Sequence, residues 1–265
     1  MTRTPSEVPV FVLCGGLGTR LREETEVRPK PMVPVGNRPI LWHIMRAYAY
    51  HGFRRFVLCL GYKAEVIKSY FLNYASMSAD FTVELKTNAV TVHSIDHDQD
   101  WQVTLADTGE LTMTGARVAR AAAKYLGDAT HFAVTYGDGL TDANFAEELR
   151  FHVEQQRLGT VLGVNPPSRF GELKVDDAHV RKFDEKPVFG EEWINGGYFF
   201  FHRKFLPYLS FEEGCVLERE PLVRLADDGQ LSIFKHRGFW ACMDTQRDRE
   251  QLEKLWGSGK APWVP

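Results

Sequence analysis

The sequence lacks the features that mark several common classes of protein. It has no run of about 18 consecutive apolar residues, the length that a transmembrane helix needs. Its 32 lysines and arginines are outnumbered by 35 aspartates and glutamates, and the resulting net charge of −3 does not indicate a basic, nucleic-acid-binding surface. We therefore expect neither a membrane partner nor a nucleic-acid partner.

Cysteine is scarce and scattered. The chain has four cysteines and no CxxC pair, and most of them stand beside apolar or aromatic residues, as reduced core thiols do. There is no HExxH motif, and His93 and His97 stand in a stretch typical of extended or loop structure. The N-terminus is too short and too polar for a signal peptide, so we expect a cytoplasmic protein.

Strand patterns and helix patterns alternate along most of the chain. Continuous apolar runs rich in β-branched residues, VPVFVLC (8–14) and RRFVLCLG (54–61), predict strands that are covered on both faces. PILWHIMRAYAYHG (39–52) and NFAEELRFHVEQQRLG (144–159) predict helices. This order predicts a single α/β domain over residues 1–265, with a mostly parallel mixed sheet flanked by helices.

Two regions depart from this rhythm. Residues 77–114 include FTVELKTNAVTVHS, in which polar and apolar residues alternate, and we interpret the region as an antiparallel β excursion from the domain. Residues 221–265 predict a C-terminal extension of two helices around the strand QLSIFKH.

A glycine-rich stretch, CGGLGTRL (14–21), follows the first predicted strand. It is neither a P-loop, which needs Gly-Lys-Ser/Thr, nor a dinucleotide fingerprint, which needs a third glycine or alanine where Leu21 stands. Glycines at the end of a strand let the main chain approach a phosphate closely. Arg20 and Lys30 add cationic side chains, and the prolines are expected to keep the loop extended without a helix until Pro39. The alternative is a plain turn with solvated cations.

Several motifs in a fixed order carry a family resemblance. GGLGTRL and RPKPMVPVGNRPIL are followed by TYGDG, INGGYF and MDTQRD. Together they resemble the sugar-1-phosphate nucleotidylyltransferases, most closely the glucose-1-phosphate cytidylyltransferase branch. One departure is visible, because Cys14 stands where the family has alanine before the two glycines.

The resemblance implies a Rossmann-like fold and an enzyme that transfers a cytidylyl group from CTP to glucose 1-phosphate. The products would be CDP-glucose and pyrophosphate, and the cofactor Mg²⁺. A phosphomonoester is already an anion near neutral pH, so the reaction needs no general base. Alternatives are transfer from dTTP, UTP or GTP, another sugar or cyclitol 1-phosphate, or a non-catalytic nucleotide-sugar-binding regulator. The resemblance also implies a homo-oligomer assembled partly through the 77–114 excursion.

The resemblance gives the charged residues their roles. Arg20 is expected to hold the β- and γ-phosphates with its planar fork, and Lys30 to stabilise the transition state at the α-phosphate. Asp138 and Asp244 are expected to bind the metal. The alternatives are that Asp138 forms a turn and that Asp244 caps the helix that follows it.

The remaining expected site residues fall into two sets. The nucleotide-binding set is Leu13, Gly15, Gly16, Gly18, Thr19, Arg20, Thr114, Gly115 and Arg117. The sugar-phosphate-binding set is Gly171, Glu185, Lys186, Asn195 and Gly196. Helix capping by Thr114 and a local ion pair between Glu185 and Lys186 are the alternatives.

Overall fold

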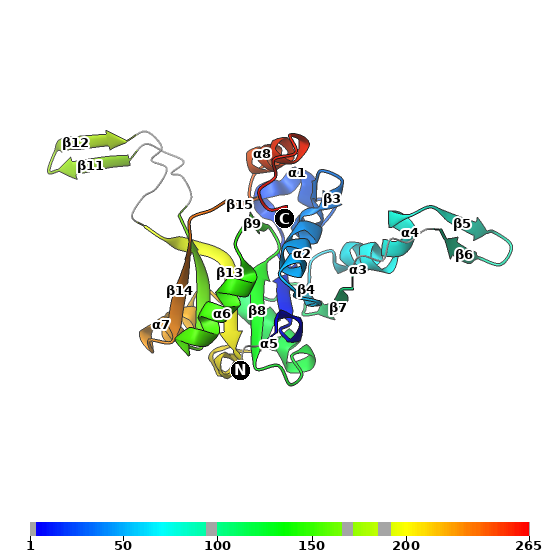
Figure 1. The fold of residues 1–265 in the computed structure, drawn as a ribbon, viewed down its shortest axis with the longest axis horizontal. Coiled ribbons are helices and arrows are strands. Elements are labelled where there is room, and N and C mark those ends of the chain that lie inside the picture. The colour runs from blue at the N-terminus through cyan, green and yellow to red at the C-terminus, as the bar shows by residue number, and fades with distance from the viewer. Residues whose placement is uncertain (1–3, 94–99, 166–171, 185–191, 265) are drawn as a thin grey trace.

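A seven-stranded sheet forms the centre of the molecule (Figure 1). The computed structural model describes residues 4–93, 100–165, 172–184 and 192–264. The strands are, in order across the sheet, β14 (Leu231–His236), β10 (Gly159–Val164), β13 (Ile194–His202), β8 (His131–Tyr136), β1 (Val10–Leu13), β4 (Arg55–Leu60) and β7 (Gln102–Asp107). Neighbouring strands are parallel except that β13 runs antiparallel to both β8 and β10. The predicted mostly parallel mixed sheet is confirmed.

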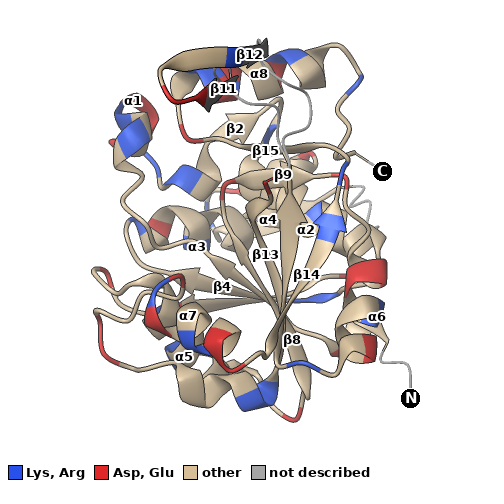
Figure 2. Ribbon diagram, turned by 90° about the vertical axis from the view of Figure 1, so that its left-hand side faces the viewer, with Lys and Arg blue, Asp and Glu red and all other residues tan. Residues whose placement is uncertain are grey.

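Helices cover both faces of this sheet. α2 (Ile40–Tyr50) and α6 (Phe145–Gln155) pack on one face, and α5 (Thr114–Tyr125) and α7 (Glu220–Asp227) pack on the other (Figure 2). The described residues also form α1 (Arg22–Thr25), α3 (Ala64–Leu72), α4 (Tyr74–Ser78) and α8 (Gln246–Gly257). Alternate residues of β1 face two different cores, as the pleat of a strand requires. Val10 and Val12 pack in the core that contains residues of α2, whereas Phe11 and Leu13 pack in the core that contains residues of α5.

The region 77–114 divides between two environments. Within it, β5 (Phe81–Glu84) and β6 (Ala89–Val92) form an antiparallel hairpin that projects from the body of the molecule (Figure 1). β7 lies in the same range but pairs parallel to β4 in the central sheet. The antiparallel excursion is thus narrower than the predicted range.

The C-terminal region is built into the domain as well as extending it. β14 forms one edge of the central sheet, and β15 (Trp240–Cys242) pairs with β9 (Gly139–Thr141) above it. Small antiparallel pairs also join β2 (Pro34–Val35) to β3 (Arg38–Pro39) and β11 (Glu172–Asp176) to β12 (His179–Asp184). Across the described ranges, no helix has both the length and the apolar character needed to cross a membrane.

The glycine-rich loop contains more helix than predicted. It includes the 3₁₀ turns η2 (Thr19–Leu21) and η3 (Lys30–Met32), with α1 between them. Gly18 adopts a left-handed conformation with φ of 63° just before η2, and the Thr25 hydroxyl donates to the carbonyls of Gly18 and Leu21. The prediction of an extended loop up to Pro39 was wrong because these short turns satisfy the main-chain hydrogen bonds locally. The described residues also form the 3₁₀ turns η1 (Pro5–Glu7) and η4 (Arg203–Tyr208).

Candidate active site

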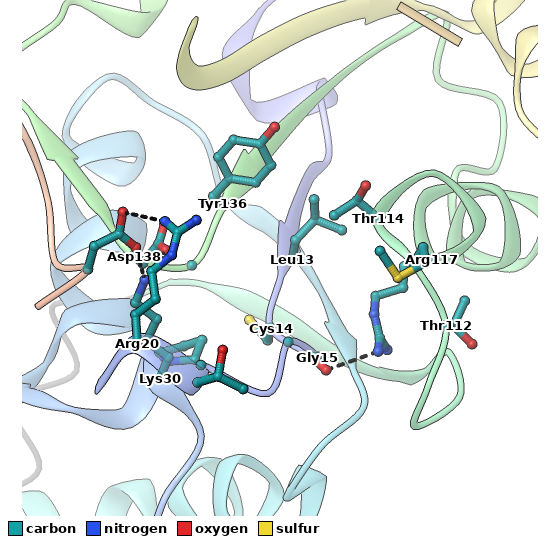
Figure 3. A pocket seen from close by; sticks show the side chains of 17 residues that line it. Leu13, Cys14, Gly15, Arg20, Lys30, Thr112, Thr114, Arg117, Tyr136 and Asp138 are labelled. Atoms are coloured by element: carbon teal, nitrogen blue, oxygen red, sulfur yellow. Dashed lines mark hydrogen bonds and ion pairs between the residues drawn. The ribbon is translucent and has the colours of Figure 1, made fainter. Parts of the chain in front are cut away.

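A cavity of about 390 Å³ opens beyond the carboxyl ends of β1 and β8 (Figure 3). This is the edge at which open α/β sheets bind ligands. Most of the predicted nucleotide and metal residues line it: Leu13, Gly15, Gly16, Gly18, Thr19, Arg20, Lys30, Thr114, Arg117, Asp138 and Asp244. Gly115 lies next to this set, buried in the first turn of α5.

Lys30 occupies the charged end of the cavity. Its Nζ lies 2.6 Å from Asp138 Oδ2 and 2.6 Å from Asp244 Oδ1, and its side chain is only 13% exposed. Burial lowers the pKa of Lys30, but the two carboxylates outweigh burial and raise the pKa overall. Arg20 is much more exposed and places Nη1 3.2 Å from Asp244 Oδ2. Burial raises the pKa of Asp244, and the hydrogen bond and charge of Lys30, with Arg20, lower it by more.

The two aspartates come together through the pairing of β9 with β15. Asp138 precedes β9, Asp244 follows β15, and the Met243 N–H donates to the Asp138 carbonyl at 2.9 Å. Asp244 is not the cap of α8, because Thr245 takes that position in a capping box with Asp248. The alternative of a helix N-cap at Asp244 is therefore wrong.

Two neighbouring carboxylates provide the oxygen ligands that Mg²⁺ prefers. Both Asp138 and Asp244 lie within 2.6 Å of the Lys30 ammonium, so they face the same small volume. Among the residues that the structure describes, no group of three or more His, Cys, Asp or Glu side chains could hold a metal ion. A metal held here would take its other ligands from phosphate and water.

Arg117 occupies the opposite end of the cavity and is buried. Its guanidinium donates to the carbonyls of Leu60 (2.8 Å), Gly109 (2.6 Å), Glu110 (3.0 Å) and Gly15 (3.0 Å), and to the Thr108 hydroxyl (2.8 Å). A Cβ built on Gly15 would lie 2.2 Å from this guanidinium, so only glycine permits the approach seen in Figure 3. Arg117 thus holds the glycine-rich loop, and its contact with a base stays a prediction.

Sequence reasoning missed this supporting role of Arg117. A signal was present in its helical position, because Arg117 lies one turn before Ala121, which is buried in the core beneath α5. A charged residue on the apolar stripe of a helix usually has a specific set of partners.

A second cavity of about 270 Å³ adjoins the first. It is lined by the predicted sugar residues Asn195 and Gly196, and it shares Arg20, Tyr136, Asp138 and Asp244 with the first cavity. Trp240, which the sequence analysis did not select, also lines it and donates from Nε1 to the Gly196 carbonyl at 2.7 Å. The predicted residues Gly171, Glu185 and Lys186 lie outside the described residues.

Thr114 does not cap α5 with its side chain. The N-cap position belongs to Met113, and the Thr114 hydroxyl donates to Glu218 Oε2 at 2.8 Å. The alternative of helix capping at Thr114 is therefore wrong, and its predicted contact with the nucleotide stays a prediction.

Comparisons with known proteins agree with this arrangement. The family described as Nucleotidyl transferase matches residues 10–215. Glucose-1-phosphate cytidylyltransferase of Salmonella typhi is 45% identical over 252 residues, which cover 95% of this chain and 97% of the relative. The probable glucose-1-phosphate cytidylyltransferase of Bacillus subtilis is 39% identical over the same shares of the two chains.

Solved structures share the fold. HddC from Yersinia pseudotuberculosis superposes with a TM-score of 0.66 at 23% identity, covering 94% of this chain and 99% of that one. A putative glucose-1-phosphate thymidylyltransferase from Bacillus anthracis superposes with a TM-score of 0.63 at 17% identity, covering 94% of each chain. At these identities the likeness is one of architecture.

Proposed function

Because the chain belongs to the nucleotidyl transferase family, we propose that it transfers the cytidylyl group of CTP to glucose 1-phosphate. The products are CDP-glucose and pyrophosphate. The observation that carries the choice of substrates is the 45% identity with the Salmonella typhi cytidylyltransferase over 95% of the chain. The geometry supports it, because two adjoining cavities share Arg20, Asp138 and Asp244 at their junction, where a nucleoside triphosphate and a sugar phosphate would meet.

The charged end of the cavity supports a mechanism based on positioning and electrostatics. An oxygen of glucose 1-phosphate attacks the α-phosphorus of CTP, and the bond to pyrophosphate breaks. The difficulty is that two anions must approach while negative charge grows on the leaving group. We assign Lys30 to the α-phosphate, since its ammonium is buried and faces the junction of the cavities. Arg20 is exposed enough to reach the β- and γ-phosphates.

Members of this family generally use a divalent metal, and the donor set here fits Mg²⁺. Asp138 and Asp244 would hold it, and bound Mg²⁺ would neutralise phosphate charge during transfer. Both carboxylates are ion-paired to Lys30. Lys30 would therefore exchange these partners for the α-phosphate, and the charge of the two carboxylates would then be neutralised by bound Mg²⁺.

The sugar-phosphate assignments extend this proposal to the second cavity. Asn195 and Gly196 would contact the hexose from β13, and Gly171, Glu185 and Lys186 would complete that side. Asn195 already has its side-chain oxygen engaged by the Gly197 N–H at 2.8 Å, which fixes the orientation of the amide.

The direct test is release of pyrophosphate by the purified protein. Each nucleoside triphosphate is combined with each of several sugar and cyclitol 1-phosphates, with Mg²⁺ and with a chelator. We expect fast release only with CTP, glucose 1-phosphate and Mg²⁺. Release with another pair would correct the substrates and keep the mechanism. Nucleotide binding by calorimetry without release from any pair would favour a regulator.

We also propose that the chain forms a homo-oligomer through the β5–β6 hairpin. The hairpin exposes Val90 (54%), Phe81 (47%) and Leu85 (87%), and apolar area of this kind usually marks a contact surface. Light scattering after gel filtration should give a multiple of the 30.3 kDa chain mass, and Val90→Lys should lower it. A wild-type protein with the mass of a single chain would contradict this assembly.

A further inference from the structure

Residues 211–218 pack against the first turn of α5, next to Thr112, Met113 and Thr114, which line the nucleotide cavity. The Gly115 N–H donates to the Cys215 carbonyl at 2.9 Å, and the Leu217 N–H donates to the Thr114 hydroxyl at 2.9 Å. A Cβ on Gly115 would lie 2.7 Å from Cys215 Sγ, so glycine is required for this approach. The segment thereby supplies a partner to an N–H that a helix start leaves free.

Glu218 ends this segment and joins two walls. One carboxylate oxygen, Oε2, accepts from the Thr114 hydroxyl at 2.8 Å, and the other, Oε1, accepts from the Tyr136 hydroxyl. Glu218 is half-buried, and burial together with its charge raises the pKa of Tyr136, so the phenol stays protonated and donates. In Figure 3 the hydroxyl ends of Thr114 and Tyr136 point to the same side of the cavity.

Tyr136 stands between the two cavities and lines both. Its ring packs against Gly197, where a Cβ would lie 2.4 Å from the ring. Asn195 lines the second cavity together with Tyr136. Hydrogen bonds therefore connect Thr114, Glu218 and Tyr136, and this series runs from the nucleotide cavity to the sugar cavity that Asn195 also lines.

We propose that Glu218 is a positioning residue that fixes the wall between the nucleotide and sugar-phosphate subsites, acting through Thr114 on one side and Tyr136 on the other. This inference rests on the proposed function for the identity of the two subsites. Glu218 itself does not line either cavity. Its two carboxylate oxygens each accept from one of the two donors, whereas glutamine would present one oxygen and one NH₂ group at the same places.

The test is steady-state kinetics of Glu218→Ala and Glu218→Gln. We expect Glu218→Ala to raise the KM for CTP and the KM for glucose 1-phosphate about fivefold each, while kcat changes less than about threefold. Glu218→Gln keeps one acceptor and should recover one of the two KM values. A residue that only supports folding would lower the amount of active enzyme and leave both KM values unchanged.

Two further variants separate the effects of the two hydrogen bonds that Glu218 accepts. Thr114→Val should raise only the KM for CTP, and Tyr136→Phe only the KM for glucose 1-phosphate. In a Glu218→Ala background both changes should have a smaller effect, because the partner through which they are coupled is gone. Equal effects with and without Glu218 would overturn the inference.

The matched control is Glu220→Gln, two residues along the chain. Glu220 is exposed and pairs with Arg224 at 3.1 Å, so both KM values should stay as in the wild type. An inactive wild-type protein would count against the proposed function alone. The inference is then tested by calorimetry, in which Glu218→Ala has to weaken CTP binding about fivefold.

Discussion

Lys30 and Arg117 are both cations at the walls of one cavity, but their partners differ in kind. Lys30 has two carboxylates at 2.6 Å, from segments 108 and 214 residues away. Arg117 has four main-chain carbonyls and one hydroxyl. A phosphate can replace the carboxylate partners of Lys30, whereas nothing in the substrates replaces the carbonyls around Arg117. The comparison separates a cation with carboxylate partners, for which we propose a role in the reaction, from a cation that holds the loop in place.

The largest effect is expected from removing the reactive cation. Lys30→Met should lower kcat about 1,000-fold and change the affinity for CTP less than about threefold, because its charge acts mainly on the transition state. Pyrophosphate release and calorimetry measure the two quantities. Arg28→Met is the control, since Arg28 is more exposed and its Nε lies 3.8 Å from Glu24 Oε2, a longer ion pair than those of Lys30. Equal losses in turnover and in CTP binding would contradict the role of Lys30.

Removing the structural cation should act on stability. Arg117→Met leaves buried carbonyls without donors, and we expect a loss of about 3 kcal/mol in the free energy of unfolding. Urea denaturation measures it. Arg120→Met on the same helix is the comparison, because Arg120 is partly exposed and contacts fewer carbonyls, and it should cost about 1 kcal/mol. A similar small loss for both variants would show that the hydrogen bonds from Arg117 to main-chain carbonyls contribute little to stability.

Gly15 and Gly16 offer a further test of whether the position of Arg117 matters to the loop. A Cβ at Gly15 meets Arg117 at 2.2 Å, whereas a Cβ at Gly16 meets no atom within 4 Å. Gly15→Ala should therefore lower the free energy of unfolding by about 2 kcal/mol, and Gly16→Ala by less than about 0.5 kcal/mol. Thermal unfolding of the pair checks this. Indistinguishable melting temperatures would mean that the loop tolerates a displaced guanidinium.

The smallest expected effect is a pH dependence of the free energy of unfolding, which comes from Asp244 and Lys30 at the charged end of the cavity. The pKa of Asp244 is lowered in the folded protein, so its ion pairs stabilise the fold above the unfolded value of 3.8. This contribution is lost as the pH falls through the lowered folded value. Lys30 has a raised pKa, so its contribution is complete below 10.5 and is lost only at higher pH.

Asp244→Asn tests the acidic side of that dependence. Because the pair is partly open to solvent, the stability difference from wild type should be only about 1 kcal/mol at pH 6. It should shrink as the pH falls below 3.8. Chemical denaturation at a series of pH values measures it. A difference that stays constant down to pH 2 would mean that Asp244 does not stabilise the fold through its charge.

Features that depend on neighbours in the chain were predictable. The apolar runs specified the strands at 8–14 and 54–61, because a strand buried on both faces needs continuous apolar residues. The alternation in 81–94 indicated the hairpin. The predicted range of the antiparallel excursion, 77–114, was too wide because β7 forms the edge of the parallel sheet. A short strand pattern does not specify which strand it pairs with.

The site depended more on contacts between distant segments. Motifs identified Lys30, Asp138 and Asp244 one at a time, and only the β9–β15 pairing places the two aspartates around one ammonium. The glycines of the loop were visible in the sequence, but the guanidinium that requires Gly15 to be glycine comes from α5.

The sequence by itself determined the order of most strands and helices, the glycine-rich first loop with its cations, and the family. Periodicity and residue type express these properties over short windows, where the chain's own geometry is enough. The tertiary structure decided which charges meet and which are enclosed. It divided the two cavity cations into one with exchangeable partners and one with fixed partners, because burial and long-range pairing arise only when the sheet brings distant loops to a common edge.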